Sequence, residues 1–149
     1  MVFIDGMAAG LAAAVLMTLF EASVWTRQGI GGVVEWQVNE VLASRLASEQ
    51  YVPEKRLGWA VLMHLTHGAV LGGLLSILIS VGAETGLATL LTLSSAYSVA
   101  LWVLVPLSCR KSLERAAGTA FTTSGMAVSL TAHVVYGFAL GGLLFLLAG

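Results

Sequence analysis

Charged residues are scarce in this sequence. They make up 10% of the 149 residues, whereas 58% are hydrophobic, and a typical soluble domain carries roughly 25% charged residues. A soluble fold of this length cannot hide that much apolar surface. The apolar residues also gather in long runs that short polar stretches separate, and this pattern indicates that lipid surrounds them.

Cysteine and functional motifs are nearly absent as well. Cys109 is the single cysteine, so an intrachain disulfide is excluded and the redox compartment stays open. Lysine and arginine together number 7 and form no cluster dense enough for nucleic acid. The sequence also lacks a phosphate-binding glycine loop, a Gly-x-Ser-x-Gly elbow and a Cys-x-x-Cys pair. We therefore expect no nucleic-acid partner and no enzymatic activity.

Long apolar runs are the main feature that is present. Each is close to the ~20 residues that a helix needs to cross a bilayer. They predict an all-α, polytopic membrane protein, with residues 1–149 forming a single membrane domain. Pro106 should kink or end the third run. The four expected transmembrane helices cover residues 4–25, 59–81, 87–107 and 125–148.

The connection between the first two runs contains a further helical pattern at residues 33–48. Its apolar residues recur at helical spacing, and its polar residues fall on other faces. One interpretation is an amphipathic helix that lies on the membrane surface. The other is a helix packed over the loop ends of the bundle. The apolar positions are Val34, Val38, Val41, Leu42 and Leu46, and the polar ones are Glu35, Asn39, Glu40 and Arg45.

The basic residues predict the orientation in the membrane. All of them fall in the first and third connections, which lie on the same side of a four-span protein. By the positive-inside rule, this side is cytoplasmic and both termini lie outside. We expect a multi-pass protein of the cell (inner) membrane, with the lipid bilayer as its first partner. The residues are Arg27, Arg45, Lys55, Arg56, Arg110, Lys111 and Arg115.

The second and fourth spans carry an internal repeat. A shift of 69 positions aligns His64–Leu75 with His133–Leu144, and 7 of the 12 positions are identical, including one histidine and three glycines. Leucine and alanine match by chance in apolar runs, but a shared His-x-x-x-Gly-x-x-x-Gly frame does so less easily. We interpret the repeat as two duplicated helical hairpins with the same orientation.

Glycine pairs spaced four apart occur in three of the four spans. Such pairs let helix backbones approach closely in a membrane. They favour association with other copies of the chain or with a larger membrane complex, although packing within the bundle can also occupy them. The pairs are Gly6 and Gly10, Gly68 and Gly72, and Gly137 and Gly141.

Ionisable residues inside the spans form the candidate site. His64 and His133 share the faces of the glycine pairs, so both should point into the bundle. Glu21 lies a few residues before the cytoplasmic end of the first span and reaches a similar depth. Ionisable groups at this depth are costly unless paired, which marks them as functional candidates. The predicted polar cluster is Glu21, His64, His67, His133 and Tyr136.

Three motifs in the second and fourth spans form a family pattern. They are the Gly58-Trp59 opening, the frame from His64 to Gly72, and the closing His133-x-x-Tyr136-Gly137-x-x-Leu140-Gly141. The pattern resembles a group of small four-helix bacterial membrane proteins related to the YagU-like inner-membrane family. This resemblance implies a four-span inner-membrane protein of undefined biochemistry. Neither Glu21 nor residues 33–48 belong to the shared pattern.

The polar cluster is compatible with three functions. In the first, the histidines only form hydrogen bonds between helices, and the protein is a structural or accessory subunit that associates through its glycine faces. In the second, the histidines bind a haem-like tetrapyrrole, or join Glu21 around a transition metal such as zinc or iron. In the third, Glu21 and the histidines pass protons or ions.

Overall fold

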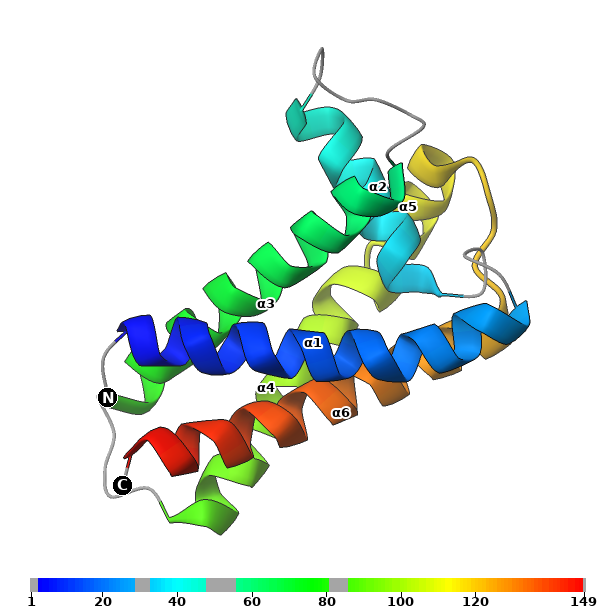
Figure 1. Ribbon diagram of the computed structural model, residues 1–149. Coiled ribbons are helices and arrows are strands. Elements are labelled where there is room, and N and C mark those ends of the chain that lie inside the picture. Colours follow the sequence, from blue (N-terminus) through cyan, green and yellow to red (C-terminus); the bar gives the residue numbers. More distant parts are fainter. Residues whose placement is uncertain (1–2, 29–32, 48–55, 81–85, 149) are drawn as a thin grey trace.

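The computed structural model describes residues 3–28, 33–47, 56–80 and 86–148, and these residues are almost entirely helical. The helix expected at residues 33–48 and the span expected at residues 59–81 have their last residues, 48 and 81, outside the described residues. Figure 1 shows the arrangement. The elements are α1 (Phe3–Gln28), α2 (Val34–Ala47), α3 (Arg56–Ser80), α4 (Leu87–Trp102), a π-helix η4 (Val103–Leu107), α5 (Arg110–Ala117) and α6 (Thr123–Ala148).

Four segments are long and apolar enough to cross a membrane, as the sequence predicted. They are Phe3–Val24, Leu57–Ser80, Leu87–Leu107 and Thr123–Leu147. Large apolar side chains such as Leu19, Leu104 and Leu146 are exposed on their outer faces, which suits contact with lipid. The fold is therefore that of an all-α protein with four helices that are long and apolar enough to cross a membrane.

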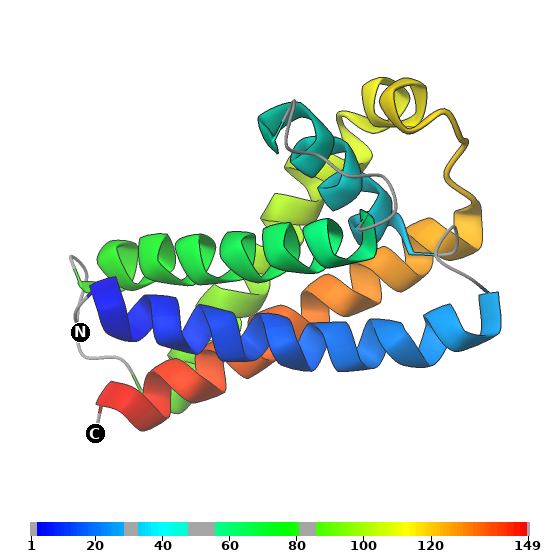
Figure 2. The same cartoon turned by 45° about the horizontal axis from the view of Figure 1, so that its top comes forward.

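The four long helices pack in the order α3, α1, α6, α4. Figure 2 shows α1 and α6 side by side. The first turn of α1 and the last turn of α6 lie at one end, while α2 and α5 lie at the other (Figure 1). Small residues of α1, such as Ala9, Ala13 and Ala14, form the core with Leu140 and Leu144 of α6. The pairing of α1 with α3 and of α4 with α6 is compatible with two hairpins, and their duplication stays a prediction.

Glycines bring these pairs into close contact in the half of the bundle that contains the start of α1, which we call the closed half. A Cβ added at Gly72 would lie 2.6 Å from the Cα of Gly10. On the other pair, a Cβ at Gly141 would lie 2.9 Å from the Cα of Leu91, and one at Gly137 2.8 Å from that of Ser95. Only glycine therefore fits without a backbone shift.

The opposite half, which we call the open half, contains α2. A helix forms where the sequence predicted one, but Val33 and the first six residues of the helix, Val34 to Asn39, are all buried. Val34 and Val38 pack against Phe121 and Met126, whereas Trp36 packs on the opposite side. Because two faces are apolar, the first half of α2 packs among the other helices. Its position at the membrane surface stays a prediction.

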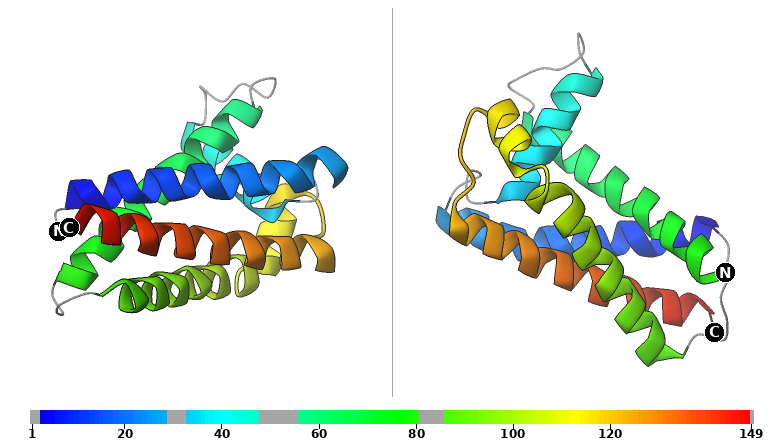
Figure 3. Two further views of the ribbon diagram at one scale, coloured as in Figure 1. Left: turned by 60° about the horizontal axis from the view of Figure 1, so that its bottom comes forward. Right: turned by 180° about the vertical axis from the view of Figure 1, so that it is seen from behind.

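Pro106 lies in a π-helix at the end of the third span, which ends one residue later at Leu107. It is buried inside η4, where the Ser108 N–H donates to the Val103 carbonyl five residues earlier at 3.0 Å. Proline has no N–H to donate, and a π turn is a common way to accommodate such a break, often at a functional site. Figure 3 shows the helix continuing past α4 toward α5.

Candidate functional site

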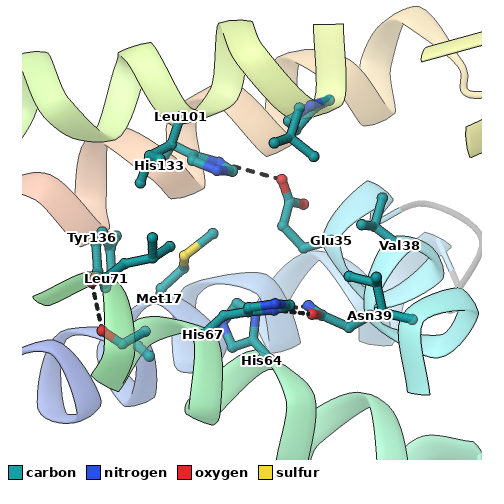
Figure 4. Close-up of a pocket in the computed structure, with 15 residues that line it drawn as sticks. Met17, Glu35, Val38, Asn39, His64, His67, Leu71, Leu101, His133 and Tyr136 are labelled. Atoms are coloured by element: carbon teal, nitrogen blue, oxygen red, sulfur yellow. Dashed lines mark hydrogen bonds and ion pairs between the residues drawn. The ribbon is translucent and has the colours of Figure 1, made fainter. Parts of the chain in front are cut away.

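A cavity of about 450 Å³ lies in the open half, with walls from α1, α2, α3, α4, η4 and α6. Figure 4 shows that polar groups gather at its α2 end. Its volume falls in the range of small-molecule sites in proteins. The lining residues are Ala14, Met17, Glu35, Val38, Asn39, Leu42, His64, His67, Gly68, Leu71, Leu101, Val105, Pro106, His133 and Tyr136.

Asn39 of α2 joins the two histidines of α3. Its Nδ2 lies 3.3 Å from Nδ1 of His64, and its Oδ1 lies 2.9 Å from Nδ1 of His67. An amide nitrogen only donates and an amide oxygen only accepts. In this arrangement the Nδ1 of His64 accepts and carries no proton, whereas the Nδ1 of His67 donates. The ring of Trp36 stacks on His64 with centroids 5.9 Å apart.

Glu35 of α2 makes the corresponding contacts with α6. Its Oε1 accepts a hydrogen bond from Ser129 and lies 3.4 Å from Nδ1 of His133. The same Nδ1 donates to the Ser129 carbonyl at 3.0 Å, so the Nε2 of a neutral His133 is an acceptor. Trp102 of α4 donates to the Ser129 hydroxyl at 3.0 Å. These contacts tie α2, α4 and α6 together around one carboxylate.

Glu21 lies behind this cavity. It is fully buried, and its Oε2 lies 4.0 Å from Nε2 of His64. Glu35 and the Trp36 side chain are also close enough to interact with Glu21. The carboxylate therefore faces the side of His64 that points away from Asn39, and Glu21 is absent from the cavity wall as the structure describes it.

Tyr136 contributes its ring to the cavity, but its hydroxyl donates to the Gly68 carbonyl at 2.8 Å. Tyr97 makes a similar bond to the Leu71 carbonyl at 3.2 Å. Both hydroxyls therefore connect helices. Of the five predicted site residues, His64, His67, His133 and Tyr136 line one cavity, while Glu21 contacts only His64 among them.

The donor set does not favour a metal ion. Within residues 3–28, 33–47, 56–80 and 86–148, no three histidine, cysteine, aspartate or glutamate side chains are placed to hold one. The predicted set of Glu21 with three histidines is therefore not assembled around one point. The tetrapyrrole interpretation needs only two histidines and stays a prediction.

Two central residues of the site, Glu35 and Asn39, are absent from the predicted polar cluster, since the sequence places them only on the polar faces of the helix expected over residues 33–48. A signal for their role was available, because they stand four apart on one helical face. That face is flanked by Val34 and Val38 on one side and Trp36 on the other. Polar residues between two apolar faces of a short helix indicate burial among other helices.

No family model, curated protein or solved structure matches the chain. The class of the protein therefore rests on its own features, which are four helices long and apolar enough to cross a membrane and a cavity with a polar end. The resemblance to the YagU-like family stays a prediction.

Proposed function

We propose that this protein binds a small amphipathic molecule in the cavity of its open half. The observation that supports this most directly is the second carboxylate oxygen of Glu35. This Oε2 is buried and has no hydrogen-bond partner among the described residues, although Glu35 is only 6% exposed and lines the cavity. A buried acceptor without a partner is costly, and a donor group bound beside Glu35 would satisfy it after a small rotation of the carboxylate.

The walls of the cavity favour a molecule with two chemically different ends. Met17, Leu71, Leu101 and Val105 offer an apolar surface, and the polar groups gather beside α2. Such a combination of apolar walls and a few convergent polar groups is typical of ligand sites. The η4 π turn supports the same proposal, because it lies in the cavity wall at a position where such turns are often functional.

The other two functions receive less support. The six predicted packing glycines all contact other helices of the same chain, so they do not favour a structural or accessory subunit that associates through them. Passage of protons or ions needs a path through both halves of the membrane. The backbone contacts of the closed half do not favour such a path.

We further propose that the cavity lies in the cytoplasmic half of the cell membrane. The basis is the position of the basic residues, since those in the described helices lie in the parts of α1, α2, α3 and α5 that flank the open half. The shared histidine and glycine frame of α3 and α6 supports an origin of the two hairpins by duplication.

A neutral photoreactive alcohol tests the binding function. We expect 3-azioctanol to label residues of the cavity, such as Met17 and Leu71, saturably in protein embedded in lipid nanodiscs. Leu101→Trp should abolish this labelling, because the indole fills the cavity. Leu93→Trp is the matched control, since Leu93 lies on the same helix and is 45% exposed. Mass spectrometry of the labelled peptides gives the readout.

Labelling that is not saturable, or that is equal in both tryptophan variants, would contradict the proposed function. Both variants must first show the helical content and elution volume of the wild type.

A further inference from the structure

Among the described residues, the cavity wall contains one carboxylic acid, Glu35. Glu21 lies behind the wall, where its Oε2 is 4.0 Å from Nε2 of His64. Within the part of the chain that the structure describes, no lysine or arginine lines the cavity. The remaining titratable groups of the wall are His64, His67, His133 and Tyr136, of which the histidines are neutral unless protonated.

Two acceptors with spare capacity, one on Glu35 and one on His133, lie at the polar end of the cavity. Glu35 uses Oε1 for Ser129 and His133, which leaves Oε2 without a partner among the described residues. His133 uses its Nδ1 proton for the Ser129 carbonyl, so its Nε2 has a lone pair. Figure 4 shows the Glu35 carboxylate beside His133 and opposite the side chains of Asn39 and His67.

This arrangement discriminates between headgroups by charge. An anionic head would meet a carboxylate and a nitrogen lone pair, and both contacts are repulsive. A neutral hydroxyl would satisfy one acceptor but leave the carboxylate charge uncompensated in an environment of low dielectric constant. A cationic head compensates this charge, and the ring of Tyr136 in the same wall offers a surface that attracts cations.

We infer that the molecule bound in this cavity is a lipophilic cation whose charged head pairs with the carboxylate of Glu35. This inference rests on the proposed function and adds the chemical class of the ligand. The apolar part of the cation would lie against Leu71 and Leu101, and Glu35 is the residue that selects the charge.

Two ions of one shape and opposite charge test the inference. Tetraphenylphosphonium and tetraphenylborate are added to the protein in nanodiscs of phosphatidylcholine, and their binding is measured by equilibrium dialysis against empty nanodiscs. We expect the protein to bind tetraphenylphosphonium saturably and at least about tenfold more tightly than tetraphenylborate. Tetraphenylphosphonium should also displace 3-azioctanol from Met17 and Leu71.

Three variants test whether the Glu35 carboxylate causes the preference for the cation over the anion. Glu35→Gln should weaken tetraphenylphosphonium binding by about tenfold or more, because it removes the charge and keeps the shape. Glu35→Asp should retain part of the affinity. Glu40→Gln is the matched control, since it removes a carboxylate from the same helix outside the cavity wall, and it should change the affinity by less than about twofold.

Equal affinity for the two ions, or a Glu35→Gln variant that binds tetraphenylphosphonium like the wild type, would overturn the inference. The comparison of the two ions uses the wild type, so it tests the charge of the ligand even if Glu35→Gln does not fold, and Glu35→Asp then tests the pairing. Labelling by 3-azioctanol without displacement by tetraphenylphosphonium would refute the cation and leave the binding function intact. Absence of saturable labelling would refute both.

Discussion

The closed and open halves of this bundle contain the same four long helices but are stabilised in different ways. In the closed half, glycines such as Gly10, Gly72 and Gly141 let helix backbones meet directly. In the open half, α2 packs among the helices, and a cavity of about 450 Å³ remains. The close contacts of one half hold the helix pairs together, so the other half can accommodate an inserted helix and a space.

Hydrogen bonding differs between the halves in the same way. In the closed half, the Ser76 hydroxyl bonds to the Gly73 carbonyl of its own helix at 2.8 Å. In the open half, Asn39 bonds to His67, and Glu35 to Ser129, across long separations in sequence. Local bonds only satisfy a buried hydroxyl, whereas long-range bonds fix the positions of separate helices. The comparison indicates a structural role for the closed half and a binding role for the open half.

The largest effect should come from breaking a close contact of the closed half. Gly141→Leu should destabilise the protein by more than about 3 kcal/mol, because its side chain must separate α6 from the backbone of α4. Gly142→Leu should have little effect, since no atom lies within 4 Å of a Cβ at Gly142. Unfolding in mixed detergent micelles measures both. Similar losses in these neighbouring variants would contradict the direct backbone contact.

A smaller effect should come from the polar contacts of the open half. Asn39→Leu keeps the approximate size of the side chain but leaves Nδ1 of His64 and of His67 without their partner. We expect a loss of about 2 kcal/mol or more, and faster hydrogen exchange in α2. Glu40→Gln is the control on the same helix. If Asn39→Leu is as stable as Glu40→Gln, then α2 is not held by the histidines.

The smallest effect should come from the margin of the open half, where Glu114 of α5 accepts hydrogen bonds from Arg110 at 2.9 Å and from the Phe121 N–H at 2.8 Å. The hydrogen bond from Arg110, followed by that from the Phe121 backbone, lowers the pKa of the Glu114 carboxyl. Glu114→Ala should therefore speed hydrogen exchange at Phe121, whereas Lys111→Ala should not.

The pH dependence of this effect has a definite sign. Because the folded-state pKa of Glu114 lies below its unfolded value, its contribution is complete above the unfolded pKa and is lost as the pH falls through the lowered pKa. The difference between the wild type and Glu114→Ala should then disappear in acid. A difference that persists in acid would mean that the carboxylate charge does not hold this loop.

The sequence by itself determined the four spans, because the length and composition of an apolar run decide whether a helix can cross a bilayer. It also indicated which glycines lie in helix contacts, and that His64, His67, His133 and Tyr136 lie near one another, since residues four apart share a helical face. Each of these properties depends on the spacing of residues within one helix, or on the fact that two helices run in the same direction.

Only the tertiary structure decided the position of α2 and therefore the site. The pattern of residues 33–48 was compatible with a surface helix. The sequence of a helix alone does not distinguish a polar face that is in water from one that contacts buried histidines. Packing of Val34 against Met126, and of Trp36 on the opposite side, buries Glu35 and Asn39. The cavity has the same origin, because a space between helices depends on how far apart several helices are held.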